Sequence, residues 1–591
     1  MDTLDERTDR RCDLLVIGSG AAGLSAAIVA RKHGLQVMVV EKEPRLGGTT
    51  AVSGGWIWIP ANPVAARSGV ADAIPEAARY LRHEAGDLFS AEHVAAYLEH
   101  GPRMVTYFEQ ETAVRFMASI DFPDYHSEAP GAARGRSIVS EPFDARELGD
   151  RLGDLRLPLR ETTLFGLNVG SGTELTHFFR ATRSLESALY VFRRVAGYAL
   201  DVLRHGRGMR LSNGNALAAR LLKSALDAGV EIVPSAPADE LIIEGGAVQG
   251  AVVEMDGQKC RIRSRRGVVL ACGGFSQDVA RRKSLFSHAP TGREHQSMVP
   301  IANTGDGLRL GESAGGIVED RLTNAAAWMP VSLVTHSDGT RAVFPHVVDR
   351  AKPGVIAVTR KGTRFVNESH SYHDFVQAMI AATKGEPDAC AFVVCDHRAI
   401  RRYGLGYVKP FPLPLREHLR SGYLLRGLTL AALAVAAGID PDGLERTVEE
   451  FNADARQARD SRFGKGTTSY NRFQGDVSHQ PNACLAPLEK PPFYAIRIVA
   501  GDIGTFAGLR ADQFGRVTGA TGQPVPGLYV AGNDMCSIMG GNYPGAGINI
   551  GPAMTFGYIV GLHAAGQLGT EDAGSLVPDI PTTRSSAQAT R

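Results

Sequence analysis

A glycine-rich turn near the N-terminus constrains the fold of this chain more than any other feature. The turn is GSGAAG (residues 18–23), and it follows a short apolar run, DLLVI (13–17). An alanine-rich stretch with helical character (24–33) comes next, and then a second apolar run, QVMVVEK (36–42). A buried strand, a glycine turn, a helix and a second strand in this order predict a βαβ unit that binds a dinucleotide.

Each glycine of the turn has its own physical task. Gly18 permits the tight turn, Gly20 lets the backbone approach a diphosphate at the helix N-terminus, and Gly23 allows helix and strand to pack closely. Glu41 follows 21 residues after Gly20, at the end of the second strand, where its carboxylate can bind a pair of ribose hydroxyls. The nucleotide contacts predicted from this unit are Gly18, Gly20, Ala21, Ala22, Gly23, Glu41 and Lys42.

The stretch RLGGTTAVSGG (residues 45–55) indicates which dinucleotide is bound. Its two glycine pairs and three hydroxyl residues leave a backbone with few side chains and many donors. Such a loop can wrap the diphosphate of a flavin nucleotide and reach the edge of the isoalloxazine ring. It therefore favours FAD over NAD, with contacts at Gly47, Gly48, Thr49, Thr50, Ser53, Gly54 and Gly55. No histidine attachment motif stands near this loop, so we expect FAD to be bound non-covalently.

The remaining patterns divide the nucleotide-binding part in two. Residues 85–205 are largely helical in pattern, with a loop near residues 122–135, and β-rich segments with a hairpin turn at Gly245–Gly246 follow. The strand GVVLACGG (267–274) is expected to return to the nucleotide sheet. The composition then becomes more mixed, with several prolines, before short strands and turns resume. We expect an α/β chain in which a Rossmann-like FAD-binding domain (1–289 and 496–570) is split by an inserted α+β catalytic domain (290–495) and followed by a disordered tail (571–591).

Charge and cysteine usage exclude several classes of protein. The 64 basic and 63 acidic side chains give a net charge of +1, which provides no reason to expect nucleic acid as a partner. The seven cysteines are scattered without C-x-x-C spacing, so we expect neither disulfides nor a metal site. This usage, together with a charged N-terminus that lacks an apolar signal segment, favours a cytoplasmic location.

One amphipathic stretch, SLESALYVFRRVAGYALDVLRHG (residues 184–206), leaves two interpretations open. Apolar residues alternate with arginine along it. Such a pattern is typical of a helix that covers a protein core, and also of a helix that lies on a membrane surface. We favour the core-facing helix and expect at most peripheral membrane association.

Motifs spread over about residues 12–566 resemble the fumarate reductase/3-ketosteroid dehydrogenase family of flavoproteins. They are GSGAAG, EK…LGGTTAVSGG, VVLACGGF, NTGDGLRLGESAGG, RFVNES, GLYVAGN and YPGAG. The resemblance implies that the inserted domain is catalytic and that the substrate lies at its junction with the flavin domain. By matching position it adds FAD contacts at Ala236 and Ala238 near the adenine, Asn533 near the diphosphate, Gly547 and Ile548 near the flavin ring, and also Ala271, Gly273, Gly274, Asn303, Asp306 and Gly532.

Within that family the chain resembles one branch more than another. The H-P-T motif of fumarate reductases is missing, and the C-terminal loop reads GGNYPGAGIN in place of an R-x-G-G substrate loop. YPGAG (543–547), RFVNESHSY (364–372) and DYHSEAPG (124–131) resemble the 3-ketosteroid Δ1-dehydrogenases. In those enzymes three tyrosines and one glycine amide perform the chemistry, and by position they correspond to Tyr125, Tyr372, Tyr543 and Gly547.

These residues suit the desaturation of a ring ketone at its α and β carbons. The Tyr543 hydroxyl and the Gly547 amide can both donate to the carbonyl oxygen, while the flavin accepts the β hydride. Tyr372 would remove the α proton as a tyrosinate, although the ordinary pKa of tyrosine is about 10. A hydrogen bond from Tyr125 can lower that pKa, and His126 is the alternative partner of the base.

The sequence therefore predicts an oxidoreductase that desaturates a ring ketone, in the first place a 3-ketosteroid, and passes electrons to an unidentified acceptor. Three alternatives stay open. They are a desaturase of a smaller cyclic ketone such as a 4-oxocyclohexane acid, a reductase of the enoate or fumarate type, and a flavin-carrying subunit or redox sensor without turnover. The tyrosines argue against the last, because a carrier needs no group that removes a proton.

Overall fold

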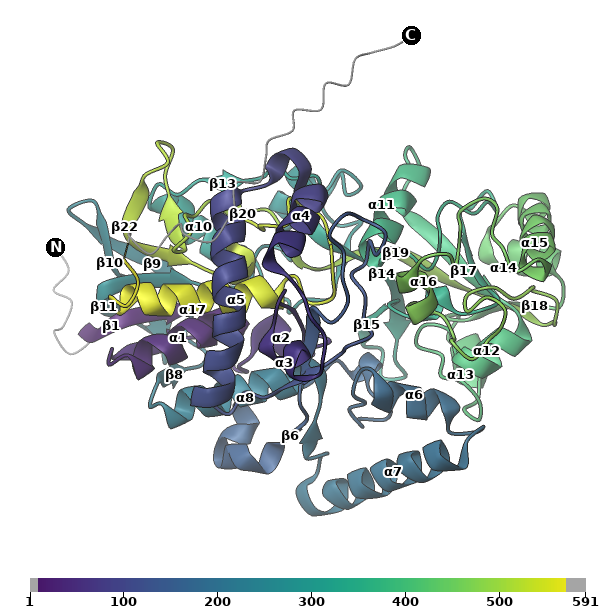
Figure 1. Cartoon of the computed structure of the whole chain (residues 1–591), viewed down its shortest axis with the longest axis horizontal. Coiled ribbons are helices and arrows are strands. Elements are labelled where there is room, and N and C mark those ends of the chain that lie inside the picture. The colour runs from purple at the N-terminus through teal and green to yellow at the C-terminus, as the bar shows by residue number, and fades with distance from the viewer. Residues whose placement is uncertain (1–8, 570–591) are drawn as a thin grey trace, which may run out of the picture.

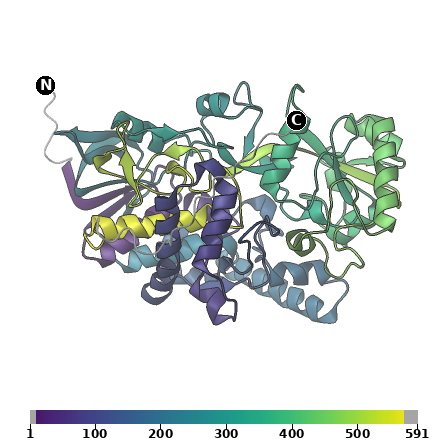
Figure 2. The ribbon, with the colours of Figure 1, turned by 45° about the horizontal axis from the view of Figure 1, so that its top comes forward.

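Two large sheets organise the protein, whose computed structural model describes residues 9–569. An eight-stranded sheet lies in the body that contains β1 and α17, and a seven-stranded sheet lies in the other body (Figure 1). Figure 2, turned by 45°, shows the same two bodies side by side. The predicted α/β class with a separate second sheet is confirmed. The disordered tail predicted at 571–591 lies outside the described residues.

The first sheet has a parallel centre assembled from distant parts of the chain. β22, β11, β1, β2 and β8 are neighbours in this order and all pair in parallel. Their bounds are β22 (Pro524–Val530), β11 (Gln258–Leu270), β1 (Asp9–Ile17), β2 (Val37–Val40) and β8 (Glu231–Val233). The strand expected to return to the nucleotide sheet is confirmed as the end of β11. The Gly245–Gly246 turn is confirmed as well, since it joins antiparallel β9 (Ala238–Glu244) to β10 (Ala247–Met255).

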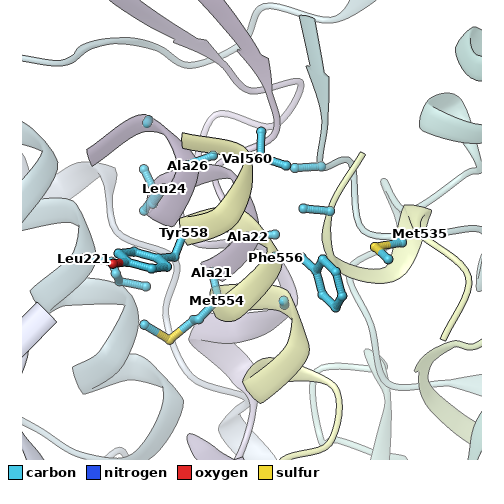
Figure 3. Close-up of a cluster of buried hydrophobic side chains, with 14 of the residues drawn as sticks. Ala21, Ala22, Leu24, Ala26, Leu221, Met535, Met554, Phe556, Tyr558 and Val560 are labelled. Carbon is cyan, nitrogen blue, oxygen red and sulfur yellow. The ribbon is translucent and has the colours of Figure 1, made fainter. Parts of the chain in front are cut away.

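Helices α1 (Ala21–Lys32) and α17 (Ile550–Ala564) pack closely against one another. A Cβ at Gly557 would lie 2.5 Å from the Ala22 carbonyl oxygen, and one at Gly561 would lie 2.7 Å from Val29 Cβ, so only glycine fits at these positions. This register means that the helices run in the same direction and begin at the same end of the sheet. Figure 3 shows the two helices side by side, with Ala21, Ala22, Leu24 and Ala26 labelled on α1, while on α17 Tyr558 lies beside Leu221 and Phe556 points toward Met535.

The second sheet is mixed and lies in the inserted part of the chain. Its path runs β15 (Arg341–Pro345), β14 (Ala326–Thr335), β19 (Phe493–Thr505), β17 (Cys390–Cys395) and β16 (Val355–Val358). β19 crosses the expected domain boundary at residue 495 and keeps pairing with β14 as far as Thr505. No turn residues interrupt the strand near 495, so composition alone marks the boundary too early.

The expectation that residues 85–205 are largely helical is wrong in the middle of that range. α5 (Ala91–Glu111) and α7 (Leu185–His205) are long helices, but three short strands stand between them. These are β4 (Phe116–Ala118), β5 (Ser137–Ser140) and β6 (Phe143–Asp144). β5 pairs with both β4 and β3 (Trp56–Trp58), so tertiary pairing overrides the local pattern.

The interpretation of residues 184–206 as a core-facing helix is also wrong. α7 lies at the edge of the molecule in Figure 1, and among its residues only Ser187 is buried. Leu185 is 87% exposed and Leu203 is 84% exposed. An amphipathic pattern fixes the two faces of a helix but not which face meets the protein. No helix within residues 9–569 has the length and apolar character that a membrane span requires.

Candidate active site

A cavity of about 1340 Å³ extends between the two bodies. One end is lined by residues of the GSGAAG turn, which directly follows β1, and by residues between 48 and 55, which include α2 (Gly48–Val52) and directly precede β3. Its middle is lined by Tyr125, Tyr372 and Tyr543, and the other end by residues of α6 (Thr173–Arg180) and α7. The predicted nucleotide residues and the predicted catalytic tyrosines therefore share one space.

At the first end the backbone is bare. A Cβ at Gly20 would meet no protein atom closer than Thr50 Oγ1 at 3.9 Å, and one at Gly48 none closer than Gly20 Cα at 3.8 Å. Both glycines border the cavity, so added side chains would project into it. The N-terminus of α1 has no side-chain cap and no acidic residue in its first turn. Bare backbone at an uncapped helix N-terminus fits a diphosphate.

Glu41 and Lys42 border the same end of the cavity, just beyond β2. Glu41 Oε2 accepts hydrogen bonds from the Ser19 amide at 3.0 Å and from the Ser19 hydroxyl at 2.7 Å. These bonds fix the carboxylate beside the glycine turn, where a ribose would lie. Lys42 forms an ion pair with Asp306, the first residue of α10 (Asp306–Ser313).

Most predicted cofactor residues lie together on this cavity. Those that line it are Gly18, Gly20, Ala21, Ala22, Glu41, Lys42, Gly48, Thr49, Thr50, Ser53, Gly54, Gly55, Ala238, Ala271, Gly273, Asn303, Asp306, Gly532, Asn533 and Gly547. Five others are not among its lining residues: Gly23, Gly47, Ala236, Gly274 and Ile548. Gly23 does not line the cavity because it packs against the turn itself. A Cβ there would lie 2.0 Å from the Gly18 carbonyl oxygen.

In the middle of the cavity three buried tyrosines form a triangle. The Tyr125 hydroxyl donates to the Tyr372 hydroxyl at 3.3 Å. The ring centroids of Tyr372 and Tyr543 are 5.0 Å apart, and those of Tyr125 and Tyr543 are 5.6 Å apart. Gly547 follows Tyr543 by four residues and has φ +101°, a conformation that suits glycine. A Cβ there would also collide with the backbone of Trp56 and Ile57.

The pKa values of the tyrosines respond first to burial. Burial raises the pKa of Tyr372 well above its ordinary value, and the neighbouring Tyr125 and Tyr543 add to this effect. The shift is opposite in direction to the lowering expected from Tyr125. Burial also raises the pKa of Tyr543 to about 12, opposed by hydrogen bonds from Tyr372 and the Gly547 amide. Tyr543 and Gly547 both line the cavity.

His126 occupies a different role from that of a base. Its Nδ1 lies 2.7 Å from Glu84 Oε2 and its Nε2 lies 2.9 Å from Asp374 Oδ2. Burial opposes the charged ring, but the two carboxylates outweigh it and raise the pKa of His126 to about 10. An imidazolium with both nitrogens engaged cannot accept a proton. It instead clamps the Tyr125 loop against α4 (Ile74–Ala85) and α11 (Tyr372–Ala382).

The loops that carry Tyr125 and Tyr543 are joined directly. The Pro544 carbonyl oxygen accepts hydrogen bonds from the Tyr125 amide at 2.9 Å and from the Tyr80 hydroxyl at 2.7 Å. Asp124, beside Tyr125, accepts from Trp58 Nε1 at 2.8 Å and pairs with buried Arg136 at 2.9 Å. Local hydrogen bonds of this kind hold the YPGAG and DYHSEAPG motifs in one fixed arrangement.

The RFVNES motif supports Tyr372 from the other side. Arg364 makes bidentate contacts with Glu368 at 2.7 Å and with Asp460 at 2.8–3.0 Å, and all three side chains are buried. Arg350 donates to the Glu368 carbonyl oxygen at 2.9 Å. This network fixes the backbone that leads into α11, whose first residue is Tyr372.

Sequence reasoning missed two buried residues beside the site. The Tyr470 ring lies 4.6 Å from that of Tyr125, and its hydroxyl accepts from Gln474 Nε2 at 2.8 Å. Asp534 accepts from the Gly274 amide at 2.9 Å and also from the Cys272 amide, which shapes the turn after β11. Asp534 directly follows the GLYVAGN motif and could have been found there. Tyr470 stands in no motif, so only the fold brings it to the site.

Proton-handling side chains beside a dinucleotide site define a flavin-dependent dehydrogenase. The sequence matches the family described as FAD binding domain over residues 13–550, and the chain belongs to that family. Within it, the chain belongs to the branch that includes the 3-ketosteroid dehydrogenases. Its cofactor is FAD, as predicted.

Several relatives match nearly the whole chain. A 4-oxocyclohex-2-ene-1-carboxylate 5-dehydrogenase of Sinomonas cyclohexanicum is 41% identical over 565 residues, which are 95% of each chain. A 3-oxosteroid 1-dehydrogenase of Mycobacterium tuberculosis is 37% identical over 95% of this chain and 100% of its own. The crystal structure of 3-ketosteroid Δ1-dehydrogenase from Sterolibacterium denitrificans with 1,4-androstadiene-3,17-dione is similar with a TM-score of 0.87, at 36% identity, over 95% of this chain and 100% of that chain.

Proposed function

We propose that this dehydrogenase introduces a double bond between the carbons α and β to a ring ketone, and that its substrate is a 3-ketosteroid. The observation that carries the proposal is the triangle of Tyr125, Tyr372 and Tyr543 on the wall of the FAD-sized cavity. It supplies a base and hydrogen-bond donors in one place. Bound FAD supplies the acceptor for the β hydride.

The Tyr543 hydroxyl and the Gly547 amide hold the substrate carbonyl oxygen. The two residues are four positions apart in one loop and both line the cavity, so their donors can serve the same atom. Both are fixed before the substrate binds, because the following loop is tied to Tyr80 and Tyr125. Fixed donors stabilise the negative charge that develops on the oxygen as the α proton leaves.

Tyr372 Oη removes the α proton. Its burial keeps the hydroxyl protonated at neutral pH, so only a small fraction is ready to act. The same burial makes that fraction a strong base, which suits the weakly acidic proton beside a ketone. Tyr125 Oη lies 3.3 Å away and donates to the phenolate when it forms. His126 acts as a positioning residue that holds the Tyr125 loop against α11.

Residues that line the cavity from Glu41 to Gly547 would hold FAD non-covalently. The α1 N-terminus and the bare backbone of Gly20 and Gly48 would contact its diphosphate. Glu41 would bind the ribose, and residues between 48 and 55, together with Gly547, would contact the flavin.

The extent of the cavity favours a large apolar substrate. Beyond the tyrosines it continues along Leu175, Phe179 and Val195 of α6 and α7, and along Leu405 and Phe411 of the inserted domain. A fused ring system fills such a space better than one six-membered ring does. The apolar side chains beyond the tyrosines would contact only the larger molecule.

A cyclic keto acid is the second candidate, and one side chain favours it. Lys352 borders the cavity, and burial lowers its pKa to about 8. Two of its protons are donated to the carbonyl oxygens of Gln474 and Gly475, at 2.7 and 2.6 Å, which leaves a third for a carboxylate. The 41% identical relative carries a name that describes such a substrate.

Anaerobic mixing of the holoenzyme with a substrate panel tests the choice. We expect 3-ketosteroids to bleach the flavin and to yield a Δ1 double bond, while 4-oxocyclohexane carboxylates react slowly. Bleaching by the keto acid alone would establish the second candidate. The variant Lys352→Met is a second test of the two candidate substrates. It should raise the KM of a keto acid, whose carboxylate Lys352 would bind, and leave the KM of a 3-ketosteroid unchanged.

A further inference from the structure

α7 is turned so that its polar face meets the protein and its apolar face meets solvent. The large apolar side chains of α7 that are exposed are Leu185, Leu189, Phe192, Val195, Leu200, Val202 and Leu203. With a 100° turn per residue, Leu185, Leu189, Phe192, Ala196 and Leu203 fall along one line of the helix. The inward line, in contrast, contains Ser187, Arg194, Tyr198 and Asp201.

The inward face is fully engaged, so α7 is not a core helix that has come loose. Arg194 Nε donates to Glu174 of α6 at 2.6 Å, and both side chains are shielded from solvent. The Tyr198 hydroxyl donates to the Phe165 carbonyl oxygen at 2.8 Å, and Asp201 accepts from the Met209 amide at 3.0 Å. Rotating the apolar face inward would break all of these contacts.

The charge of this segment differs from that of the whole chain. Residues 173–210 contain seven arginines and three acidic residues, whereas the entire protein has a net charge of +1. Arg193 and Arg204 of α7 are exposed and lie beside its apolar line. A helix about 30 Å long with an apolar face bordered by arginine has the chemistry of an interfacial helix.

The cavity reaches the same surface. Leu175, Phe178 and Phe179 of α6 and Val191 and Val195 of α7 line its far end. An apolar passage thus leads from the tyrosine triangle to the hairpin formed by α6 and α7.

We propose that the α6–α7 hairpin, residues 173–205, docks on a lipid bilayer that carries anionic headgroups, with the apolar line of α7 in the interface and its arginines among the phosphates. A second copy of this chain fits less well, because pairing two hairpins would bring the flanking arginines of one against those of the other. The proposal is independent of which ring ketone is the substrate.

Co-sedimentation of the holoenzyme with vesicles, in the absence of any ring ketone, tests the docking. Phosphatidylcholine vesicles with phosphatidylglycerol should bind the protein at least about tenfold more tightly than phosphatidylcholine alone, since each basic residue near an anionic surface adds to the affinity. The double variant Phe192→Glu, Leu203→Glu should lose at least about tenfold of that binding. Both residues lie outside the cavity lining, so flavin content and turnover without vesicles should be unchanged.

Val435→Glu is the matched control. Val435 is 73% exposed on α14 (Leu430–Ala437), in the inserted domain, against 69% for Phe192. It should bind vesicles like the unmodified protein. The proposal is overturned if the double variant binds vesicles as tightly as the unmodified protein does. It is also overturned if Val435→Glu weakens vesicle binding as much as the double variant does. Sedimentation velocity without lipid tests the alternative, in which a second copy of this chain covers the apolar line of α7. If the unmodified protein is a dimer and the double variant is a monomer, this face is an interface between two chains and the proposal is wrong.

Discussion

The nucleotide end of the cavity and the tyrosine triangle are built in opposite ways. The first is made of backbone from two nearby loops, residues 18–23 and 48–55, and it depends on side chains that are missing. The second is made of side chains from three distant segments, around Tyr125, Tyr372 and Tyr543, and it depends on one hydroxyl from each.

This difference predicts how each region fails. Adding an atom to the nucleotide end should weaken FAD binding and leave the chemistry of bound FAD intact. Removing an atom from the triangle should stop the chemistry and leave FAD in place. The two kinds of substitution therefore separate binding from catalysis within one cavity.

Tyr372→Phe should have the largest effect. The substitution keeps the buried ring and removes only the hydroxyl, so packing against Tyr543 survives. Loss of a general base should slow flavin reduction by about 10²–10⁴. Anaerobic stopped-flow mixing with substrate measures this rate, and the flavin spectral shift on adding a keto product should give a nearly normal affinity.

Tyr470→Phe is the matched control for that variant. Tyr470 is equally buried and touches Tyr125, but it is not among the residues that line the cavity. Its reduction rate should stay within a few-fold of the unmodified enzyme. A reduction rate near that of the unmodified enzyme in Tyr372→Phe would remove this residue as the base.

Tyr543→Phe should have the next largest effect and a different signature. It removes one of the two donors to the carbonyl oxygen and should slow flavin reduction by roughly 10²–10³. Because the same donor holds the ketone of the product, the product affinity should fall together with the rate. Normal product binding in this variant would argue that Tyr543 does not contact the ketone.

The pH dependence of flavin reduction should report on Tyr372 itself. The pKa of this group is raised well above its ordinary value, so the tyrosinate fraction, and with it the rate, should rise about tenfold per pH unit between roughly pH 7 and 9. His126 stays protonated over this range, since its pKa is raised to about 10. The remaining flavin reduction by Tyr372→Phe should not rise with pH in this way. A rate that falls with pH would contradict the assignment.

Gly20→Ala should have the smallest effect and should act on FAD alone. Gly20 has φ −73°, which alanine adopts without strain, and the added Cβ would project into the cavity. Titration of apoprotein with FAD should give an affinity weakened by roughly tenfold, or about 1.4 kcal/mol. Reduction of the bound flavin should be close to normal. Gly197→Ala is the control and should bind FAD normally, because its Cβ meets no atom within 4 Å, its φ is not positive and it does not line the cavity.

The sequence by itself determined the parts of this protein that are encoded locally. A glycine turn between a strand and a helix, with Glu41 at the end of the next strand, defines a dinucleotide site within 30 residues, because backbone conformation depends on neighbouring residues. The α/β class and FAD followed from these motifs and are confirmed. The catalytic tyrosines were reached through resemblance of motifs and not through spacing.

Only the tertiary structure decided what depends on contacts between distant segments. Burial, which raises the pKa of Tyr372, comes from segments far apart in the sequence, among them those of Tyr125 and Tyr543. The two carboxylates that hold His126 charged stand on different helices, and no motif contains Tyr470. The orientation of α7 follows from the polar contacts of its inward face, made by Arg194, Tyr198 and Asp201. An amphipathic sequence specifies two faces of a helix and leaves the choice between them to the rest of the fold.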